Sequence, residues 1–415
     1  MHEKRQNLHL IVLTVIAVIF LIAGLHRITY LYFIPFFEGS RPFSQDFKIF
    51  YYSAKTFFEA PLNIYNAPIS GIPVPYLYPP PSIFLFVPFS LLPEVSSYFS
   101  FVLIGILAYI ISIRLLIKSI EINIDIKFVR FQRICIWLIA FGFGPFIQNL
   151  RQGQVTSFVL LACVGTYYLL IRGKNTSAAG ILLIGFWIKL YPIILFPLLL
   201  KEKKYIQVAI GTGLGILLPM IITIFFSPFE IFSVYFTRIV PSTSQQIMLN
   251  PLNQSIAGFL MRVSAGATSF TSWNYFFVPV GIKVTVIIIS LISLSWIFHY
   301  FFKKSANSLF VFISLTSITS MISFLGWEYS YLLALPLVIY SIGILPNINP
   351  SQKLIVFICI LALIIPKPPD EFTPQIIEIM PLFIANILYS RYIFAVIGIN
   401  IICYIFISKQ NKILR

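Results

Sequence analysis

The sequence predicts an all-α polytopic membrane protein, because its composition is strongly apolar and its apolar runs are long and uninterrupted. Hydrophobic residues make up 59% of the 415 residues, charged residues only 10%, and the mean hydropathy is +0.92. Soluble domains carry roughly 25% charged residues. Runs such as 8–25 and 284–302 match the roughly 20 apolar residues of a spanning helix. They also lack the alternation that is typical of barrel strands.

The net charge of +16 does not indicate a nucleic-acid partner, because the basic residues are scattered over short loops. Membrane lipids with acidic headgroups are the simpler partner for such loops. The four cysteines lie inside apolar runs without paired spacing, and the four histidines lack metal-ligand spacing. We therefore predict neither a disulfide nor a metal site. Motifs for nucleotide binding and metal-dependent sugar transfer are missing, so no cofactor is expected.

The first apolar segment follows Lys4 and Arg5 and is too long for a signal peptide, so we interpret it as a retained helix that starts in the cytoplasm. We expect about 11–13 transmembrane helices in total. The expected helices lie at about 8–29, 95–118, 132–149, 155–171, 176–190, 191–200, 205–226, 278–302, 307–325, 331–346, 352–366 and 390–408. The segment 81–93 is interpreted as re-entrant or interfacial, and 191–200 is short for a crossing because ten residues span about 15 Å.

A single integral-membrane domain is expected over 1–415, with two long outer regions. The first outer loop covers 30–80 and includes an amphipathic interfacial helix from Phe47 to Phe58. The second covers 227–275. In this topology, most of the basic residues face the cytoplasm, and the clusters of unexplained polar residues share the outer face. Such a distribution is typical of a functional site on that face.

Asp46 lies in the first outer loop of a chain with only 13 acidic residues. One interpretation is structural, because aspartate is a favoured N-cap and would open the amphipathic helix that follows. The other is chemical, because a carboxylate near apolar surface has the properties of a general base. The two roles are compatible.

Three further polar residues fall at the outer ends of predicted helices. Lys189 ends an apolar helix, and it either reaches the interface with its amino group or binds a lipid-linked phosphate. Arg151 lies in a strongly polar turn together with Gln154. A solvated hairpin explains such a turn, but an arginine beside glutamines also suits phosphate and hydroxyl recognition.

The later outer segments contain Asn253-Gln254-Ser255 and Trp327-Glu328-Tyr329. Asn253 could simply cap a helix, or the two amides of Asn253 and Gln254 could contact a sugar. Glu328 could contact lipid headgroups, but an ionisable residue at such a position is a functional candidate by default.

Several short motifs follow one another in a recognisable order and spacing between about residues 40 and 340. They are Asp46-Phe47, Tyr51-Tyr-Ser-Ala54, Ile64-Tyr65, Tyr76-Leu-Tyr-Pro-Pro-Pro81, Pro88, Leu92-Pro93, Gly153-Gln154, Ala179-Gly180, Lys189-Leu-Tyr-Pro192 and Asn253-Gln-Ser255. Together they resemble the GT-C fold glycosyltransferases. The resemblance is strongest to glycosyltransferase family 87, the polyprenol-phosphate-mannose-dependent α-1,2-mannosyltransferase-like family.

This resemblance implies a polyprenyl-phosphate sugar donor, a lipid or glycan acceptor, and an active site on the outer face of the bacterial inner (cytoplasmic) membrane. It implies that Asp46 is the catalytic base and that Lys189 and Arg151 bind the donor phosphate. Tyr78, Gln154, Asn253, Gln254, Glu328 and Tyr329 are the candidate residues for binding the sugar or the acceptor. Family members often carry a Trp-Glu-His-Tyr-like motif, whereas this chain reads Trp-Glu-Tyr-Ser-Tyr. Mannose is therefore the favoured sugar but not the assigned one.

Two other classes of protein would use a similar set of outer residues. A transporter or flippase of a lipid-linked substrate would bind it without breaking a bond, but would need polar groups along both faces of the membrane. A ligase or polymerase of surface polysaccharide would also use a long outer loop with basic residues. The concentration of polar groups on one face favours the transferase over the transporter.

Overall fold

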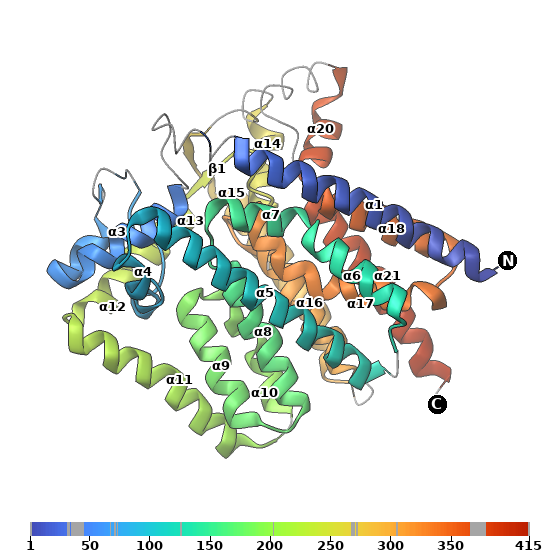
Figure 1. Ribbon diagram of the computed structural model, residues 1–415, viewed down its shortest axis with the longest axis horizontal. Coiled ribbons are helices and arrows are strands. Elements are labelled where there is room, and N and C mark those ends of the chain that lie inside the picture. Colours follow the sequence, from blue (N-terminus) through green and yellow to red (C-terminus); the bar gives the residue numbers. More distant parts are fainter. Residues whose placement is uncertain are drawn as a thin grey trace. The chain divides into compact units, whose positions relative to one another are not determined.

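The computed structural model is helical almost throughout (Figure 1). The described residues are 2–30, 34, 45–66, 68–69, 72, 74–124, 127–201, 203–266, 270, 273–303, 306–365 and 379–413. Most of 31–44, the beginning of the predicted first outer loop, lies outside the described residues. The described residues contain one sheet, which pairs two antiparallel strands of three residues each. The all-α polytopic class predicted from the sequence is confirmed.

Five helical segments among the described residues are long and apolar enough to cross a membrane. They are α5 (Glu94–Ile124), α11 (Tyr205–Phe226), α15 (Val280–Phe301), α21 (Arg391–Ile413) and the run Glu328–Asn347. The helix predicted over 132–149 is broken at Gly142, where α6 (Arg130–Phe141) and α7 (Gly144–Gln152) meet at a bend of 43°. Seven shorter apolar helices accompany these segments. The total number of crossings stays a prediction.

Contacts within the chain divide it into two compact units, and each unit combines separate stretches of sequence. The second unit comprises Ala23–Ser119 and Gln148–Ser242. Its elements are α3 (Gln45–Glu59), η2 (Pro61–Tyr65), η3 (Pro80–Leu85), α4 (Val87–Ser90), most of α5, the end of α7, α8 (Thr156–Ile171), α9 (Asn175–Ile188), η4 (Tyr191–Leu195), α10 (Phe196–Lys201), α11, α12 (Glu230–Val234), η5 (Tyr235–Ile239) and the first half of α13 (Val240–Gln245). The predicted interfacial helix is α3, and the segment 81–93 forms η3 and α4.

The first unit comprises Met1–Ile22, Ile120–Ile147 and Thr243–Arg415. Its elements are most of α1 (His2–Ile28), the end of α5, α6, the start of α7, β1 (Gln246–Met248), α14 (Ile256–Ala265), β2 (Tyr275–Phe277), α15, α16 (Ser308–Ile322), η7 (Glu328–Ala334), α17 (Leu335–Ile344), η8 (Leu345–Asn347), α18 (Pro350–Ile364), α20 (Leu382–Tyr389) and α21. Every residue of α17 is buried, which is expected of a helix that is apolar on all sides. The core of this unit therefore lies around α17, which packs against α16 and α21.

Side chains at the helix ends explain where two of these helices begin. Asn307 precedes α16, and its side chain accepts a hydrogen bond from the backbone N–H of Phe310. Asn349 precedes α18 and exchanges hydrogen bonds with Gln352 in a capping box. Such caps satisfy N–H groups that have no partner inside the helix.

In the second unit, α9 lies between α8 and α11 (Figure 1). A Cβ on Gly211 would collide with the carbonyl of Thr176, and one on Gly215 would lie 2.9 Å from the carbonyl oxygen of Gly180. The Trp187 indole N–H also donates to the Gly215 carbonyl oxygen at 3.1 Å. In these contacts the residue number increases in α9 and in α11 at the same time, so the two helices run parallel. The intervening segment η4–α10 therefore returns the chain to the side from which α9 starts.

The close approach of α9 and α11 gives a direct test of the packing. Gly211→Ala places a methyl group against the backbone of α9, and we expect it to lower stability by roughly 1–3 kcal/mol. Gly213→Ala is the matched control, because a Cβ there meets nothing within 4 Å. Thermal unfolding of both variants in detergent measures the difference. Equal midpoints for the two would contradict the parallel α9–α11 contact.

Candidate active site

Asp46 lies in the first turn of α3, inside the helix and not before it. A negative charge in this turn interacts favourably with the helix dipole. The half-buried carboxylate points to another segment, because its Oδ2 atom accepts a hydrogen bond of 2.7 Å from Nε2 of Gln154. Within the described part of the chain, no other hydrogen bond to this carboxylate is found. The predicted cap is thus replaced by a contact between α3 and the turn before α8.

Gln154 connects Asp46 with Tyr78. Its side chain is buried, and its Oε1 atom accepts a hydrogen bond of 3.0 Å from the hydroxyl of Tyr78. Both ends of the amide are therefore engaged, which determines its orientation with Nε2 toward Asp46. The structure thereby brings three residues predicted from the sequence into one hydrogen-bonded chain.

Gly153 allows this chain to form. Its φ is +60°, a conformation that glycine adopts without the steric cost of a Cβ. A Cβ here would lie 2.8 Å from Cβ of Phe47 and 3.0 Å from Cε2 of Tyr98. The backbone next to Gln154 thus lies directly against the helix that carries Asp46.

A second set of contacts anchors α3 to the beginning of α5. Glu94 forms an ion pair with Lys48 at 3.2 Å and accepts a hydrogen bond from the Tyr52 hydroxyl at 2.8 Å. The hydrogen bond to Glu94 is the main reason why the pKa of Tyr52 is raised, to about 12. Lys48 and Tyr52 are one turn apart, so a single carboxylate holds one face of α3. The Tyr51 hydroxyl adds a bond of 2.8 Å to the carbonyl of Leu92.

Lys189 and Arg151 provide positive charge near Asp46. Lys189 directly follows the last residue of α9, and its amino group lies 5.5 Å from the ring centres of both Tyr78 and Tyr191. Arg151 lies in the last turn of α7. Burial raises the pKa of the Asp46 carboxyl above 3.8, although the Gln154 hydrogen bond and both cations act in the opposite direction. A carboxylate with a raised pKa is a stronger base.

The structure places Asn253 and Gln254 in the first unit, where both are fully buried. The Asn253 amide N–H donates to the carbonyls of Met248 and Phe324, and its Oδ1 accepts from backbone N–H groups. Gln254 donates to the carbonyls of Pro251 and Tyr389. These amides join distant backbone segments, so the prediction that they contact a sugar continues to rest on the sequence alone.

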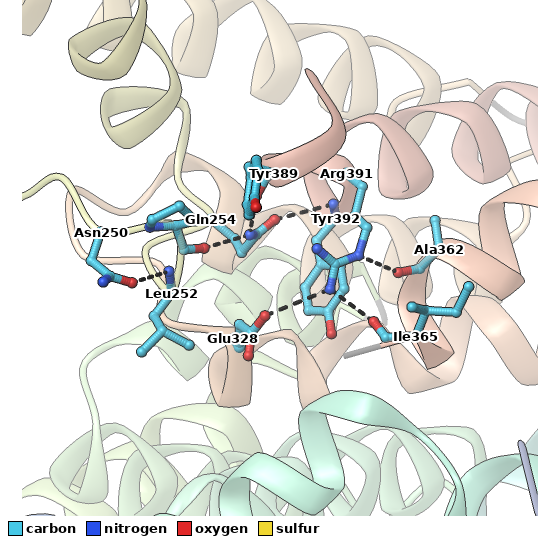
Figure 2. Close-up of polar contacts among 10 residues, drawn as sticks. Asn250, Leu252, Gln254, Glu328, Ala362, Ile365, Tyr389, Arg391 and Tyr392 are labelled. Atoms are coloured by element: carbon cyan, nitrogen blue, oxygen red, sulfur yellow. Dashed lines mark hydrogen bonds and ion pairs between the residues drawn. The ribbon is translucent and has the colours of Figure 1, made fainter. Parts of the chain in front are cut away.

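Glu328 is also buried in the first unit, 3.7 Å from the guanidinium of Arg391 (Figure 2). Arg391 additionally donates to the carbonyls of Ala362 and Ile365 at 3.1 and 2.8 Å. Tyr329 is buried next to Trp327, with ring centres 6.5 Å apart. Glu328 thus has a protein cation beside it, and its contact with sugar or acceptor stays a prediction.

A family model described as Glycosyltransferase family 87 matches residues 76–363. The chain belongs to glycosyltransferase family 87. The match covers Tyr78, Gln154 and Lys189 but begins after Asp46. Membership of this family makes the protein a membrane glycosyltransferase, which confirms the class predicted from the ordered motifs. No curated protein and no solved structure matches the chain.

The most deeply buried cation among the described residues of this family 87 glycosyltransferase, Arg262, was not predicted from the sequence. Arg262 has no exposed surface, and its guanidinium donates to Asn386, Ser390 and the carbonyls of Leu249 and Asn253. An arginine in the apolar helix α14 was the available signal.

Among the described residues, no group of three His, Cys, Asp or Glu side chains could hold a metal ion.

The close approach at Gly153 predicts a loss of activity when a side chain is added. Gly153→Ala gives a residue with a Cβ a positive φ, and the added methyl group collides with the side chain of Phe47. The turn must then move away from α3, which displaces Gln154 from Asp46. Because small misplacements in an active site are costly, we expect kcat to fall roughly tenfold or more. Gly266→Ala is the control, since its φ is +83° but a Cβ there meets nothing within 4 Å. Similar kcat values for both variants would contradict the role of this contact.

Proposed function

We propose that the protein transfers a sugar, with mannose favoured, from a polyprenyl-phosphate donor to a hydroxyl group of a lipid or glycan acceptor. We place this reaction on the extracytoplasmic face of the cytoplasmic membrane. The observation that carries the proposal is the hydrogen-bonded chain from Tyr78 through Gln154 to Asp46, with Lys189 beside it. It combines an oriented carboxylate with a nearby cation in one partly buried place.

In this proposal Asp46 is the general base. Gln154 holds Oδ2, so the acceptor hydroxyl approaches Oδ1 and gives its proton to the carboxylate. Burial raises the pKa of Asp46, which makes its carboxylate a better proton acceptor. Positioned base catalysis typically contributes about 10²–10⁴-fold to the rate.

The acceptor oxygen forms a bond to the anomeric carbon of the sugar while the bond from that carbon to the phosphate oxygen breaks. A single displacement of this kind inverts the configuration at the anomeric carbon. The polyprenyl phosphate leaves with the bonding electrons, and Lys189 and Arg151 stabilise its negative charge. Fixed cations of this kind are effective because they act where charge develops.

An apolar surface at the end of α3 opposite to Asp46 suits the prenyl chain of such a donor. The Phe226 ring lies 5.7 Å from the rings of both Phe58 and Phe84. Phe58 and Phe226 are exposed, and Phe84 belongs to η3. A long isoprenoid chain would cover these rings at the end of the loop that carries Tyr78.

Incubating purified protein with a radiolabelled polyprenyl-phosphate sugar and membrane lipids tests the proposal. Movement of the label into a new lipid or glycan product supports sugar transfer. Redistribution of intact donor across vesicle membranes would instead indicate a flippase, and joining of preformed oligosaccharides would indicate a ligase or polymerase.

Asp46→Asn should reduce sugar transfer at least about 100-fold, because the amide cannot accept the proton of the acceptor. Glu59→Gln is the matched control, since it removes the same charge from the exposed end of the same helix α3. Donor binding and membrane insertion should be unchanged in both. Full transfer activity in Asp46→Asn would exclude Asp46 as the base.

Lys189→Met should raise the KM for the donor by roughly tenfold, because it removes the cation that faces the phosphate but keeps an apolar side chain of similar length. Lys189→Arg should retain most of the affinity. Steady-state kinetics with varied donor concentration measure both. An unchanged KM in Lys189→Met would remove the phosphate-binding role.

A further inference from the structure

A basic pocket lies at the opposite end of α9 from Lys189. It has a volume of about 370 Å³ and is lined by Tyr168, Leu169, Arg172 and Lys174. The Arg172 guanidinium lies 5.8 Å from the centre of the Tyr168 ring. Neither catalysis nor the packing of α8 and α9 requires two cations at this position.

The turn between α10 and α11 brings further cations to the same place. The Nζ atom of Lys204 lies 4.0 Å from the position that a Cβ on Gly173 would take. Lys201 and Lys203 are its neighbours in the sequence, and Glu202 between them lies outside the described residues. The two turns therefore carry five basic residues and one acidic residue.

The parallel arrangement of α9 and α11 adds to this positive charge. Both helices begin here, and neither N-cap residue, Lys174 or Lys204, uses its side chain as a cap. Asn175 in the first turn of α9 donates a hydrogen bond of 3.2 Å to the side-chain oxygen of Gln207 in the first turn of α11, so the two helix starts are adjacent. Adjacent positive dipole ends increase the attraction for an anion.

An exposed apolar stripe begins in the first turn of α11, which directly follows Lys204. On α11, a potential membrane span, it consists of Tyr205, Ile206, Ile210, Leu214 and Leu217. A free phosphate ion would use only the cations, whereas a phospholipid would use the cations for its headgroup and this stripe for an acyl chain. The combination favours an amphiphilic anion.

We propose that this pocket binds the phosphate headgroup of an anionic phospholipid, with an acyl chain along the exposed face of α11. Arg172 and Lys174 contact the phosphate, and Lys204 adds charge from the neighbouring turn. The site lies on different residues from those of sugar transfer. Its test is therefore independent of the proposed function.

Native mass spectrometry of the purified full chain in detergent, titrated with phosphatidylglycerol or phosphatidylcholine, tests this site. We expect tighter binding of phosphatidylglycerol to the wild-type protein. The double variant Arg172→Gln/Lys174→Gln should weaken that binding roughly tenfold or more, because each basic residue near anionic lipid contributes appreciably. Arg172→Lys/Lys174→Arg should retain it and shows that the pocket tolerates substitution.

Lys127→Gln/Arg130→Gln is the matched control, because it removes the same charge from exposed residues outside the pocket. Unchanged binding in this control supports a specific site. Equal weakening in both double variants, or wild-type binding in the pocket variant, would overturn the proposal. Displacement of phosphatidylglycerol by equimolar inorganic phosphate would also overturn it, since the pocket would then recognise a free anion.

Discussion

The hydrogen bond between Gln154 and Asp46 is the contact on which the geometry of the candidate active site depends. It joins two segments that are 108 residues apart in the sequence. Two other features make it possible. Glu94 holds the face of α3 against α5, and Gly153 lets the backbone of the turn approach Phe47. The carboxylate is thus oriented from two sides before any substrate arrives, which is the condition for effective base catalysis.

The apolar surroundings determine how these charges interact. In water, the attraction between Lys189 and Asp46 would be weak, but in a partly buried place it is screened much less. Burial alone raises the pKa of the Asp46 carboxyl, and the neighbouring cations alone lower it. The two effects oppose each other at Asp46, and burial, the larger of them, raises the pKa of its carboxyl.

The sequence predicted the fold class well, because composition and run length report directly on the lipid environment. It also singled out Asp46, Tyr78, Gln154 and Lys189, which the structure brings together, since polar residues are conspicuous in an apolar chain. The partners of Glu94 and Arg262 could not be predicted, because those contacts join segments far apart in the sequence. Asn253 and Gln254 show a further limit. A buried amide that binds backbone carbonyls has the same sequence signal as one that binds a sugar.

The length of α9 determines how deep in the membrane Lys189 lies and therefore where it would contact a donor. Its 14 residues span about 21 Å, whereas the apolar core of a bilayer is about 30 Å thick. If its basic start lies at the inner surface, Lys189 lies below the plane of the outer headgroups. In the proposed reaction, the donor phosphate would then descend below that plane, or the outer leaflet would thin locally. The protein would thus bind the substrate below the headgroup plane, where water competes less for its charged group.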